Sequence, residues 1–292
     1  MDRLVFLLGS GLARGAVLAL FALALVLIWR GARVVNFAQG AMAVASTYVA
    51  FEVTSATGSY WLGLVAALLA GGLLGFAVER GVMRFASPQS PLSGVIMAIG
   101  LVMVLQSGLG IAFGADYRPM RVPFDDSAIV VGGVPLLSPY DLFVLVVAVL
   151  VMVVLAIGFR WTSAGLQMRA AAFAPEVSRL LGIRVSRTVT AGWVLSSVVG
   201  SLAALLLVPT SLGLNPHATD SLFVLGFTVA VVGGLDSPVG ALVGGITVGV
   251  AMSLVTGYLG AGLVPIAVLV LLVLVLLLRP AGLFAAAEAR RA

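Results

Sequence analysis

The sequence predicts an all-α protein, a polytopic bundle of transmembrane helices. Of its 292 residues, 62% are hydrophobic and 9% are charged, whereas a soluble protein is roughly a quarter charged. The mean hydropathy is +1.22. Apolar runs recur along the chain with mostly short breaks, and each crossing of a bilayer needs about 20 apolar residues. We therefore expect residues 1–292 to form one transmembrane domain.

The apolar runs predict about nine crossings, within a range of eight to ten. They fall at about residues 7–29, 36–53, 60–79, 92–113, 140–159, 188–209, 221–235, 239–257 and 262–278. The run at 221–235 is short for a hydrocarbon core of roughly 30 Å. It also contains Gly226, Gly233 and Gly234, so a broken or re-entrant helix is an alternative there.

The arginines predict the direction of the chain, because short cytoplasmic loops retain basic residues. All 16 basic residues are arginine. If the N-terminus lies outside, Arg3, Arg118 and Arg121 face outward and Arg14 lies near the outer end of the first span. The other 12 then lie on the cytoplasmic side: Arg30, Arg33, Arg80, Arg84, Arg160, Arg169, Arg179, Arg184, Arg187, Arg279, Arg290 and Arg291. The expected topology is N-out/C-in.

The outer loop at 114–139 is longer than a turn. It contains three aspartates and four prolines, and its run at 128–135 is typical of a small β-hairpin. Two interpretations remain open for this loop: a solvated connector, or part of a docking surface for something outside the cell.

The inner loop at 160–187 is too polar to cross the bilayer, yet it predicts two short helices. Residues 165–174 are good helix formers. In the segment that follows, Pro175 suits a first helical position, Glu176 favours the positive helix end, and Gly182 suits a left-handed stop.

An apolar face on the second short helix comprises Val177, Leu180 and Leu181. A structured amphipathic element between spans is what a docking site for a cytoplasmic partner requires. The alternative is an interfacial helix that lies on the lipid headgroups.

Several chemistries are excluded by missing residue types. The absence of lysine excludes a Walker A nucleotide loop and a lysine Schiff base. The absence of cysteine excludes thiol nucleophiles and thiolate metal sites, and the single histidine cannot build a multi-histidine site. We expect no catalytic residue, no metal site and no cofactor-binding site in this chain.

Charged residues are expected only at the ends of the spans. Glu52, Glu79, Asp141, Asp220 and Asp236 all fall there, so an ion-motive mechanism has no relay at mid-membrane. His217 belongs to an outer turn with Asn215 and Pro216, where a turn residue is favoured over a catalytic one.

Small residues at four-residue spacing predict close helix packing. The pairs are Gly71 with Gly75, Gly240 with Gly244, and Gly245 with Gly249. Lining of a path or of a subunit seam is the less favoured alternative for these glycines.

Two stretches interrupt the apolar pattern near predicted cytoplasmic turns. In the first, Asn36 and Gln39 open the second span, and buried amides need hydrogen-bond partners. Bonding between helices is slightly favoured over contact with cargo for these two amides.

In the second stretch, Asp236 or Ser237 is expected to cap the helix that starts at Pro238. Paired interruptions point to a transport pathway, which we predict to include Asn36, Gln39, Gly40, Gly233 and Gly234.

Four blocks of the sequence resemble the permease subunits of bacterial branched-chain amino-acid ABC importers, most closely the H-type subunit. The blocks are RVVNFAQG at 33–40, GLQMRA at 165–170 through LGI at 181–183, GGLDSPVGA at 233–241 with two further glycines at 244–245, and RPAGLF at 279–284. They occur in the family's order and span nearly the whole chain. Related permeases carry urea, short amides, sugars or nucleosides, so the resemblance is less specific to cargo.

The resemblance implies an ABC-importer permease fold in the bacterial inner membrane, surrounded by lipid, with no nucleic-acid partner. It implies a second permease subunit, usually a different chain, two cytoplasmic ATPases that bind ATP and Mg, and a periplasmic or lipid-anchored substrate-binding protein. On this view the chain is a transport subunit and not an enzyme. An ATPase-independent channel is the alternative from another class.

The family's coupling helix lies in the inner loop and inserts into a cleft of the ATPase. The corresponding residues here are Gly165, Met168, Arg169, Ala170, Pro175, Glu176, Leu180, Leu181 and Gly182. Arg169 stands where the general ABC-permease loop has a glutamate. Phe173 and Ala174 stand where relatives often have acidic residues, so one polar contact with the ATPase is expected to be missing.

Overall fold

The computed structural model describes residues 2–86, 91–125, 127–131, 134–210, 213–279 and 282–284. Arg290, Arg291, Pro280 and Ala281, which entered the predictions above, lie outside these residues. The α-helices are α1 (Asp2–Ala32), α2 (Gln39–Thr57), α3 (Tyr60–Gly81), α4 (Pro91–Phe113), α5 (Pro139–Trp161), α6 (Ser163–Phe173), α7 (Pro175–Leu180), α8 (Val185–Leu207), α9 (Asp220–Gly233), α10 (Pro238–Tyr258) and α11 (Val264–Leu278). Three short 3-10 turns cover Met83–Phe85, Val208–Thr210 and Ala261–Leu263.

Every one of the nine apolar runs is a helix, but the count of nine crossings is not confirmed. Within the described residues, seven helices are long and apolar enough to cross a membrane: α1, α3, α4, α5, α8, α10 and α11. The span that contains α11 includes the 3-10 turn before it and covers Ala261–Leu278, 18 residues. Helix α9 has 14 residues and is about 21 Å long, short of a core of roughly 30 Å. The run at 221–235 is therefore a helix shorter than a full span, and a broken or re-entrant helix there stays a prediction.

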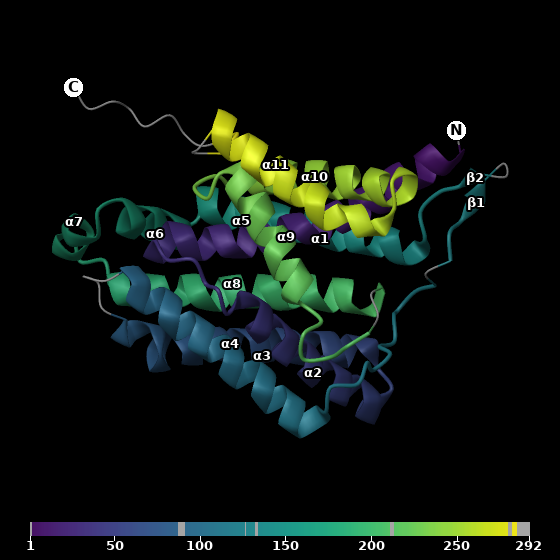
Figure 1. The fold of residues 1–292 in the computed structure, drawn as a ribbon. Coiled ribbons are helices and arrows are strands. Elements are labelled where there is room, and N and C mark those ends of the chain that lie inside the picture. Colours follow the sequence, from purple (N-terminus) through teal and green to yellow (C-terminus); the bar gives the residue numbers. More distant parts are fainter. Residues whose placement is uncertain are drawn as a thin grey trace.

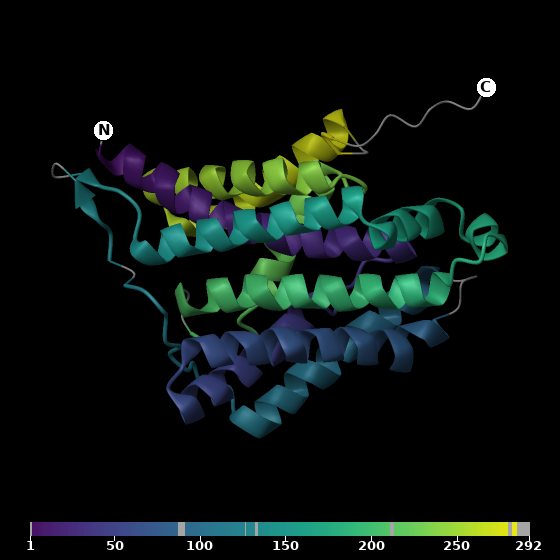
Figure 2. The same ribbon diagram turned by 180° about the vertical axis from the view of Figure 1, so that it is seen from behind.

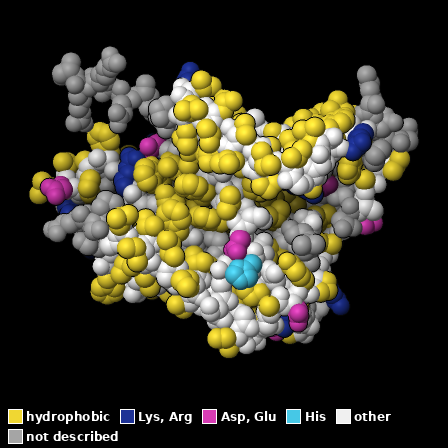
Figure 3. Space-filling view, viewed as in Figure 1, with side chains coloured by type: hydrophobic (Ala, Val, Ile, Leu, Met, Phe, Trp, Pro, Cys, Tyr) yellow, Lys and Arg dark blue, Asp and Glu magenta, His cyan; other side chains and the backbone are white. Residues whose placement is uncertain are grey.

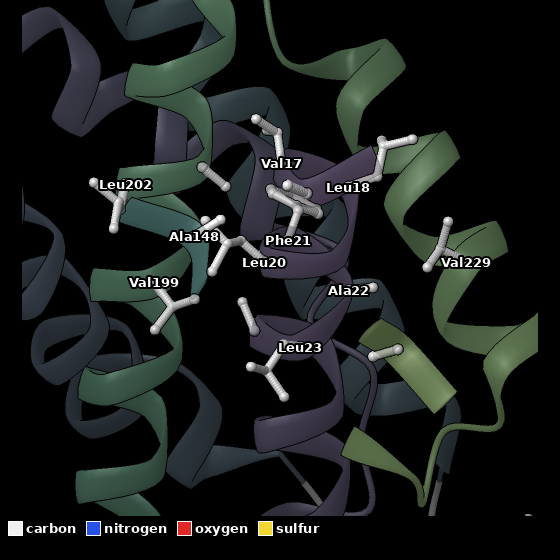
Figure 4. Close-up of a cluster of buried hydrophobic side chains, with 14 of the residues drawn as sticks. Val17, Leu18, Leu20, Phe21, Ala22, Leu23, Ala148, Val199, Leu202 and Val229 are labelled. Carbon is white, nitrogen blue, oxygen red and sulfur yellow. The ribbon is translucent and has the colours of Figure 1, made fainter. Parts of the chain in front are cut away.

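The first helix forms the centre of the bundle. In α1, 89% of the most apolar stretch is buried, against 6% in α4 and 11% in α11. Figure 4 shows Leu20 and Phe21 of α1 between Val199 and Leu202 of α8 and Val229 of α9. A helix that is apolar all round belongs either in a core or in lipid. Here α1 occupies the core, and α4 and α11 carry the exposed apolar surface (Figure 3).

The three glycine pairs pack helices together, as their spacing predicts. Gly71 and Gly75 lie against Ser201 and Ser197 of α8, and Gly240 and Gly244 lie against Gly233 and Val229 of α9. Gly245 and Gly249 lie against Ala19 and Gly15, and these four residues are named the α1–α10 seam. A Cβ added to Gly245 would lie 2.6 Å from the Ala19 Cα atom, so no larger residue fits without moving a helix.

The two long loops lie at opposite ends of the bundle. Figures 1 and 2 place the N-terminus and the β-hairpin at one end, and α7 with the last described residues at the other. The hairpin pairs β1 (Val130–Val131) with β2 (Val134–Pro135) in antiparallel register. This confirms the hairpin expected within 128–135.

Candidate functional site

The inner loop folds as the two predicted short helices. Thr162 caps α6 by accepting a hydrogen bond from the Gly165 amide. Pro175 occupies the start of α7, as its fixed backbone angle favours. Gly182 has φ +82°, and the Ile183 amide donates to the Ser178 carbonyl at 2.9 Å. This left-handed stop ends α7 where the sequence predicts.

The far end of α7 and the residue after it leave three apolar side chains largely exposed. Val177, Leu180 and Leu181 are 55%, 88% and 76% exposed, and they are named the α7 tip. Exposed leucines on a helix that projects beyond the bundle (Figure 1) are typical of a surface that a partner buries. Among the coupling residues predicted from the family, Arg169 and Glu176 are also exposed.

Other predicted coupling residues line a groove between α6 and α8. Met168, Leu181 and Gly182 line it together with Arg187 of α8, and its volume is about 480 Å³. Gly165 is buried against the Gly158 carbonyl and the backbone of Phe159 in α5. Gly165 therefore sets the angle between α5 and α6, whereas Met168 faces the groove. Phe173, which the sequence analysis did not assign to the coupling face, is 81% exposed near the same end.

Asn36 and Gln39 lie inside the bundle, where each amide is hydrogen-bonded. Asn36 Nδ2 donates to Gln39 Oε1 at 2.9 Å, and Gln39 Nε2 donates to the Ser196 carbonyl at 3.2 Å. The Ser196 hydroxyl donates in turn to the Ala24 carbonyl of α1 at 2.6 Å. Both amide side chains are 0% exposed. Gln39 therefore has the helix-to-helix bonding that the sequence slightly favours, whereas Asn36 bonds only locally among these contacts, to Gln39, Met42 and the Ala38 amide.

Helices α2 and α9 both begin within the bundle. Ser196, to which Gln39 bonds, is the middle residue of α8 (Val185–Leu207), so it lies about 16 Å from either end of that helix. Thr219, the residue before α9, donates a hydrogen bond through Oγ1 to the Gly40 carbonyl at 2.8 Å. The starts of α2 and α9 are thus joined at this depth. Thr219 was not among the predicted path residues.

The second predicted interruption lies at the end near α7. Gly233 packs against the Gly240 backbone, and Ser237 caps α10 by accepting from the Gly240 amide at 2.9 Å. The last described residues contact this turn, where the Leu283 amide donates to the Val232 carbonyl at 2.9 Å. Of the two predicted caps, Ser237 is confirmed.

The two interruptions are linked across 203 positions of sequence by an ion pair. Arg33 Nη1 lies 2.7 Å from Asp236 Oδ1, and both side chains are about half exposed. Arg33 also has φ +54°, the only positive value among the described residues other than glycine. The ion pair therefore joins the turn before α2 to the turn between α9 and α10. The predicted path residues of these turns contact other parts of the chain: Asn36 bonds to Gln39, and Gly234 packs against Gly282.

Asp220 lies at a helix end, as the sequence predicts, but this end lies beside the inner part of α4. Asp220 is the first residue of α9, and it accepts a hydrogen bond from Gln106 Nε2 at 2.7 Å. Gln106 is 15 residues from the start of α4 and seven from its end. The segment before α9 folds back against α2 and α4, an arrangement that the apolar runs did not predict. In the sequence, only the short length of the run at 221–235 indicated that α9 begins part-way along the bundle.

Seven helices of membrane-crossing length, with two further helices that start inside the bundle, define a multi-pass integral membrane protein with the interrupted helices typical of transporters. Residues 7–279 match the family model described as branched-chain amino acid transport system / permease component. The chain therefore belongs to this family of the bacterial inner membrane.

Curated relatives are similar over nearly their whole length. The chain is 27% identical to the high-affinity branched-chain amino acid transport system permease protein LivH of Salmonella typhimurium, over 97% of the chain and 96% of that protein. It is 28% identical to LivH of Escherichia coli, with the same coverage. It is 27% identical to BraD of Pseudomonas aeruginosa, a permease protein described in the same words, over 97% and 96%.

A solved structure shares the fold. PsaBC from Streptococcus pneumoniae, in complex with Fab, aligns with a TM-score of 0.51 and 12% identity over 91% of this chain and 90% of that chain. At this identity the likeness supports the arrangement of helices alone.

Proposed function

We propose that this chain is the permease subunit of an ATP-driven, binding-protein-dependent importer of branched-chain amino acids. The observation that carries the proposal is the α7 tip, three exposed apolar residues on a short helix beyond the end of the bundle. The family supports the same reading. The chain has no lysine for a nucleotide loop, so the energy for transport comes from another chain.

The α7 tip is assigned to the cytoplasmic side, and the N-terminus and the hairpin to the outside. The arginines of the inner loop support this N-out/C-in orientation, because basic residues are retained in short cytoplasmic loops. In this orientation the coupling loop at 160–187 contacts one subunit of a pair of cytoplasmic ATPases, which bind ATP and Mg. The outer loop at 114–139 faces a periplasmic or lipid-anchored binding protein.

Coupling is assigned to two kinds of residue. The α7 tip supplies apolar area, worth about 1.5–3 kcal/mol for each leucine that becomes fully buried. Arg169 and Glu176 supply the exposed charges beside it. Movement of the ATPase pair displaces α6 and α7, and Gly165 transmits this displacement to α5 because the two backbones touch there.

The transport path is assigned to the two interruptions, at Asn36, Gln39 and Gly40 and at Gly233 and Gly234. Alternating access requires that segments in this region change position. In the present conformation Asn36 bonds to Gln39, and Gln39 bonds to Ser196 of α8, which is compatible with a state in which the path is shut. A second permease subunit, a different chain, completes the path.

The test is to replace Arg169 and Glu176 together by alanine in the reconstituted importer. Transport of leucine should be uncoupled from ATP hydrolysis, because the charges that position the ATPase are lost while the buried core is untouched. Membrane insertion should be unchanged. Transport at the wild-type ratio to ATP hydrolysis would contradict the coupling assignment.

The matched control replaces Arg121 and Asp116, exposed residues of the outer loop, by alanine. Their loss removes the same charges from the opposite end and should leave the ratio of transport to hydrolysis unchanged. Solute flux through the purified chain without any ATPase would favour the channel alternative. Uptake of urea, short amides, sugars or nucleosides in place of leucine would keep the importer class and change the cargo.

A further inference from the structure

A polar cluster lies exposed on the apolar face formed by α4 and α9. It consists of Gln106, His217 and Asp220, which are named the 106–217–220 cluster. Gln106 Nε2 donates to Asp220 Oδ1 at 2.7 Å, and His217 Nδ1 lies 2.9 Å from Asp220 Oδ2. The side chains of His217 and Asp220 are 63% and 54% exposed.

This cluster is far from both ends of the bundle. Gln106 lies about 22 Å from the start of α4 and about 10 Å from its end, given 15 and seven residues at 1.5 Å each. Thr219, directly before Asp220, bonds to the start of α2 at the level of the middle of α8. Figure 3 shows the chain's single histidine near the middle of a mostly hydrophobic face, with an acidic side chain beside it.

An exposed carboxylate at this depth is incompatible with a lipid-facing surface. Ionisable residues within the membrane are costly and face the interior of a bundle or a water-filled cavity. As the first residue of α9, Asp220 also favours the positive end of that helix. A carboxylate can stabilise the positive end of a helix without being exposed. This effect therefore does not explain why Asp220 is half exposed beside Gln106 of α4.

An apolar surface begins one turn away from the carboxylate. Val224, four residues after Asp220, is 57% exposed, and residues four apart lie on the same face of a helix. Phe223 and Phe227 stack with ring centroids 6.2 Å apart, and Phe37 lies 5.9 Å from Phe223. A carboxylate next to an aliphatic and aromatic surface matches a ligand with an ammonium group and an apolar side chain.

We propose that the 106–217–220 cluster lines the aqueous part of the transport path, and that the Asp220 carboxylate receives the ammonium group of a branched-chain amino acid as it passes. This assignment rests on the proposed function. Gln106 and His217 position the carboxylate through the two hydrogen bonds above. The apolar side chain of the cargo lies along Val224 and the neighbouring phenylalanines.

The first experiment tests the aqueous exposure. The chain contains no cysteine, so His217→Cys introduces its single thiol, and labelling of this chain by a charged thiol reagent can be measured in the complete importer in proteoliposomes. The control is Val104→Cys, an apolar residue of α4 that is 69% exposed. The proposal expects rapid labelling at 217, slower labelling when binding protein and leucine are supplied, and none at 104. Equal labelling at the two positions, or none at 217, would overturn it.

The second experiment tests the carboxylate. In the same complex, Asp220→Asn should lower leucine uptake per ATP hydrolysed by about tenfold or more, as expected for the loss of a hydrogen bond to a charged group. Asp220→Glu should retain more uptake than Asp220→Asn, and Asp116→Asn in the outer loop should have no effect. Unchanged uptake by Asp220→Asn would overturn this site alone. Failure of the wild-type complex to move leucine would instead contradict the proposed function.

Discussion

The α1–α10 seam and the α7 tip are both short apolar stretches of helix, yet they differ in what covers them. In the seam, Gly15 and Ala19 meet Gly249 and Gly245 so closely that no added side chain fits. At the tip, Leu180 and Leu181 are 88% and 76% exposed. The apolar surface of the seam is buried within one chain, whereas that of the tip can be buried only by a partner. Substitutions in the first should therefore affect folding, and those in the second should affect coupling.

The largest effect is expected in the seam. Gly249→Leu places a side chain where the Gly15 backbone lies, so α1 and α10 must separate. We expect the loss of more than about 3 kcal/mol of stability, beyond the usual cost of overpacking, because backbone atoms cannot repack. The yield of monodisperse protein in detergent and its thermal unfolding measure this. Gly108→Leu is the control, since nothing lies within 4 Å of a Cβ at Gly108. Equal stability of the two variants would contradict the role of the seam.

The second effect is expected at the tip and leaves the fold intact. Leu180→Ser with Leu181→Ser should weaken ATPase binding by about 100-fold, because the burial of two leucines contributes about 3 kcal/mol or more. Thermal unfolding of the permease alone should change by less than about 0.5 kcal/mol, as for other surface substitutions. Co-purification with the ATPase measures the first quantity. The paired change Ile129→Ser and Leu136→Ser, at the opposite end, should leave ATPase binding unchanged; a similar loss there would show that the effect is not specific to the tip.

A smaller effect is expected at the buried amides. Gln39→Leu removes the donor to the Ser196 carbonyl and the acceptor for Asn36 Nδ2. Unsatisfied buried groups cost about 1–3 kcal/mol each, so we expect a loss of stability within that range. Thr247→Val serves as the control, because the Thr247 hydroxyl is exposed and bonds only to the Val243 carbonyl of its own helix. Wild-type stability for Gln39→Leu would argue against a structural role for this amide.

The smallest effect is expected at the exposed ion pair. Asp236→Asn breaks the ion pair with Arg33. The Asp236 side chain is 49% exposed and the Arg33 side chain is 58% exposed. Exposed pairs contribute about 0–1 kcal/mol and are screened by salt. Unfolding in low and high salt should therefore differ more for the wild type than for the variant. A loss of more than about 2 kcal/mol in the free energy of unfolding would show that this pair stabilises the fold as the seam does, and would contradict its assignment as a surface contact.

Local features of the structure follow from the sequence to a large extent. All nine apolar runs are helices, Pro175 and Gly182 bound α7, and the glycine pairs pack helices. Each of these depends on residues within one helix or one turn, where spacing and backbone preference decide the outcome.

Long-range features were not predicted, because they depend on where the chain folds back. The contact of Thr219 with Gly40 joins residues 179 positions apart, and it places the exposed Asp220 side chain beside Gln106 of α4. Only the short length of the 221–235 run indicated this. The ion pair of Arg33 with Asp236 likewise has no counterpart in local pattern. The amides at Asn36 and Gln39 were identified as buried polar groups, but their partner on α8 was not.

The most direct test of the coupling account is a photo-crosslinking residue placed at position 180 in the assembled importer. The account predicts an adduct with the ATPase subunit, because Leu180 is the most exposed residue of the α7 tip. The same residue at position 104, on the apolar face of α4, should give no ATPase adduct. The absence of an ATPase adduct from position 180, in a complex that hydrolyses ATP and transports leucine, would contradict the assignment of α7 as the coupling element.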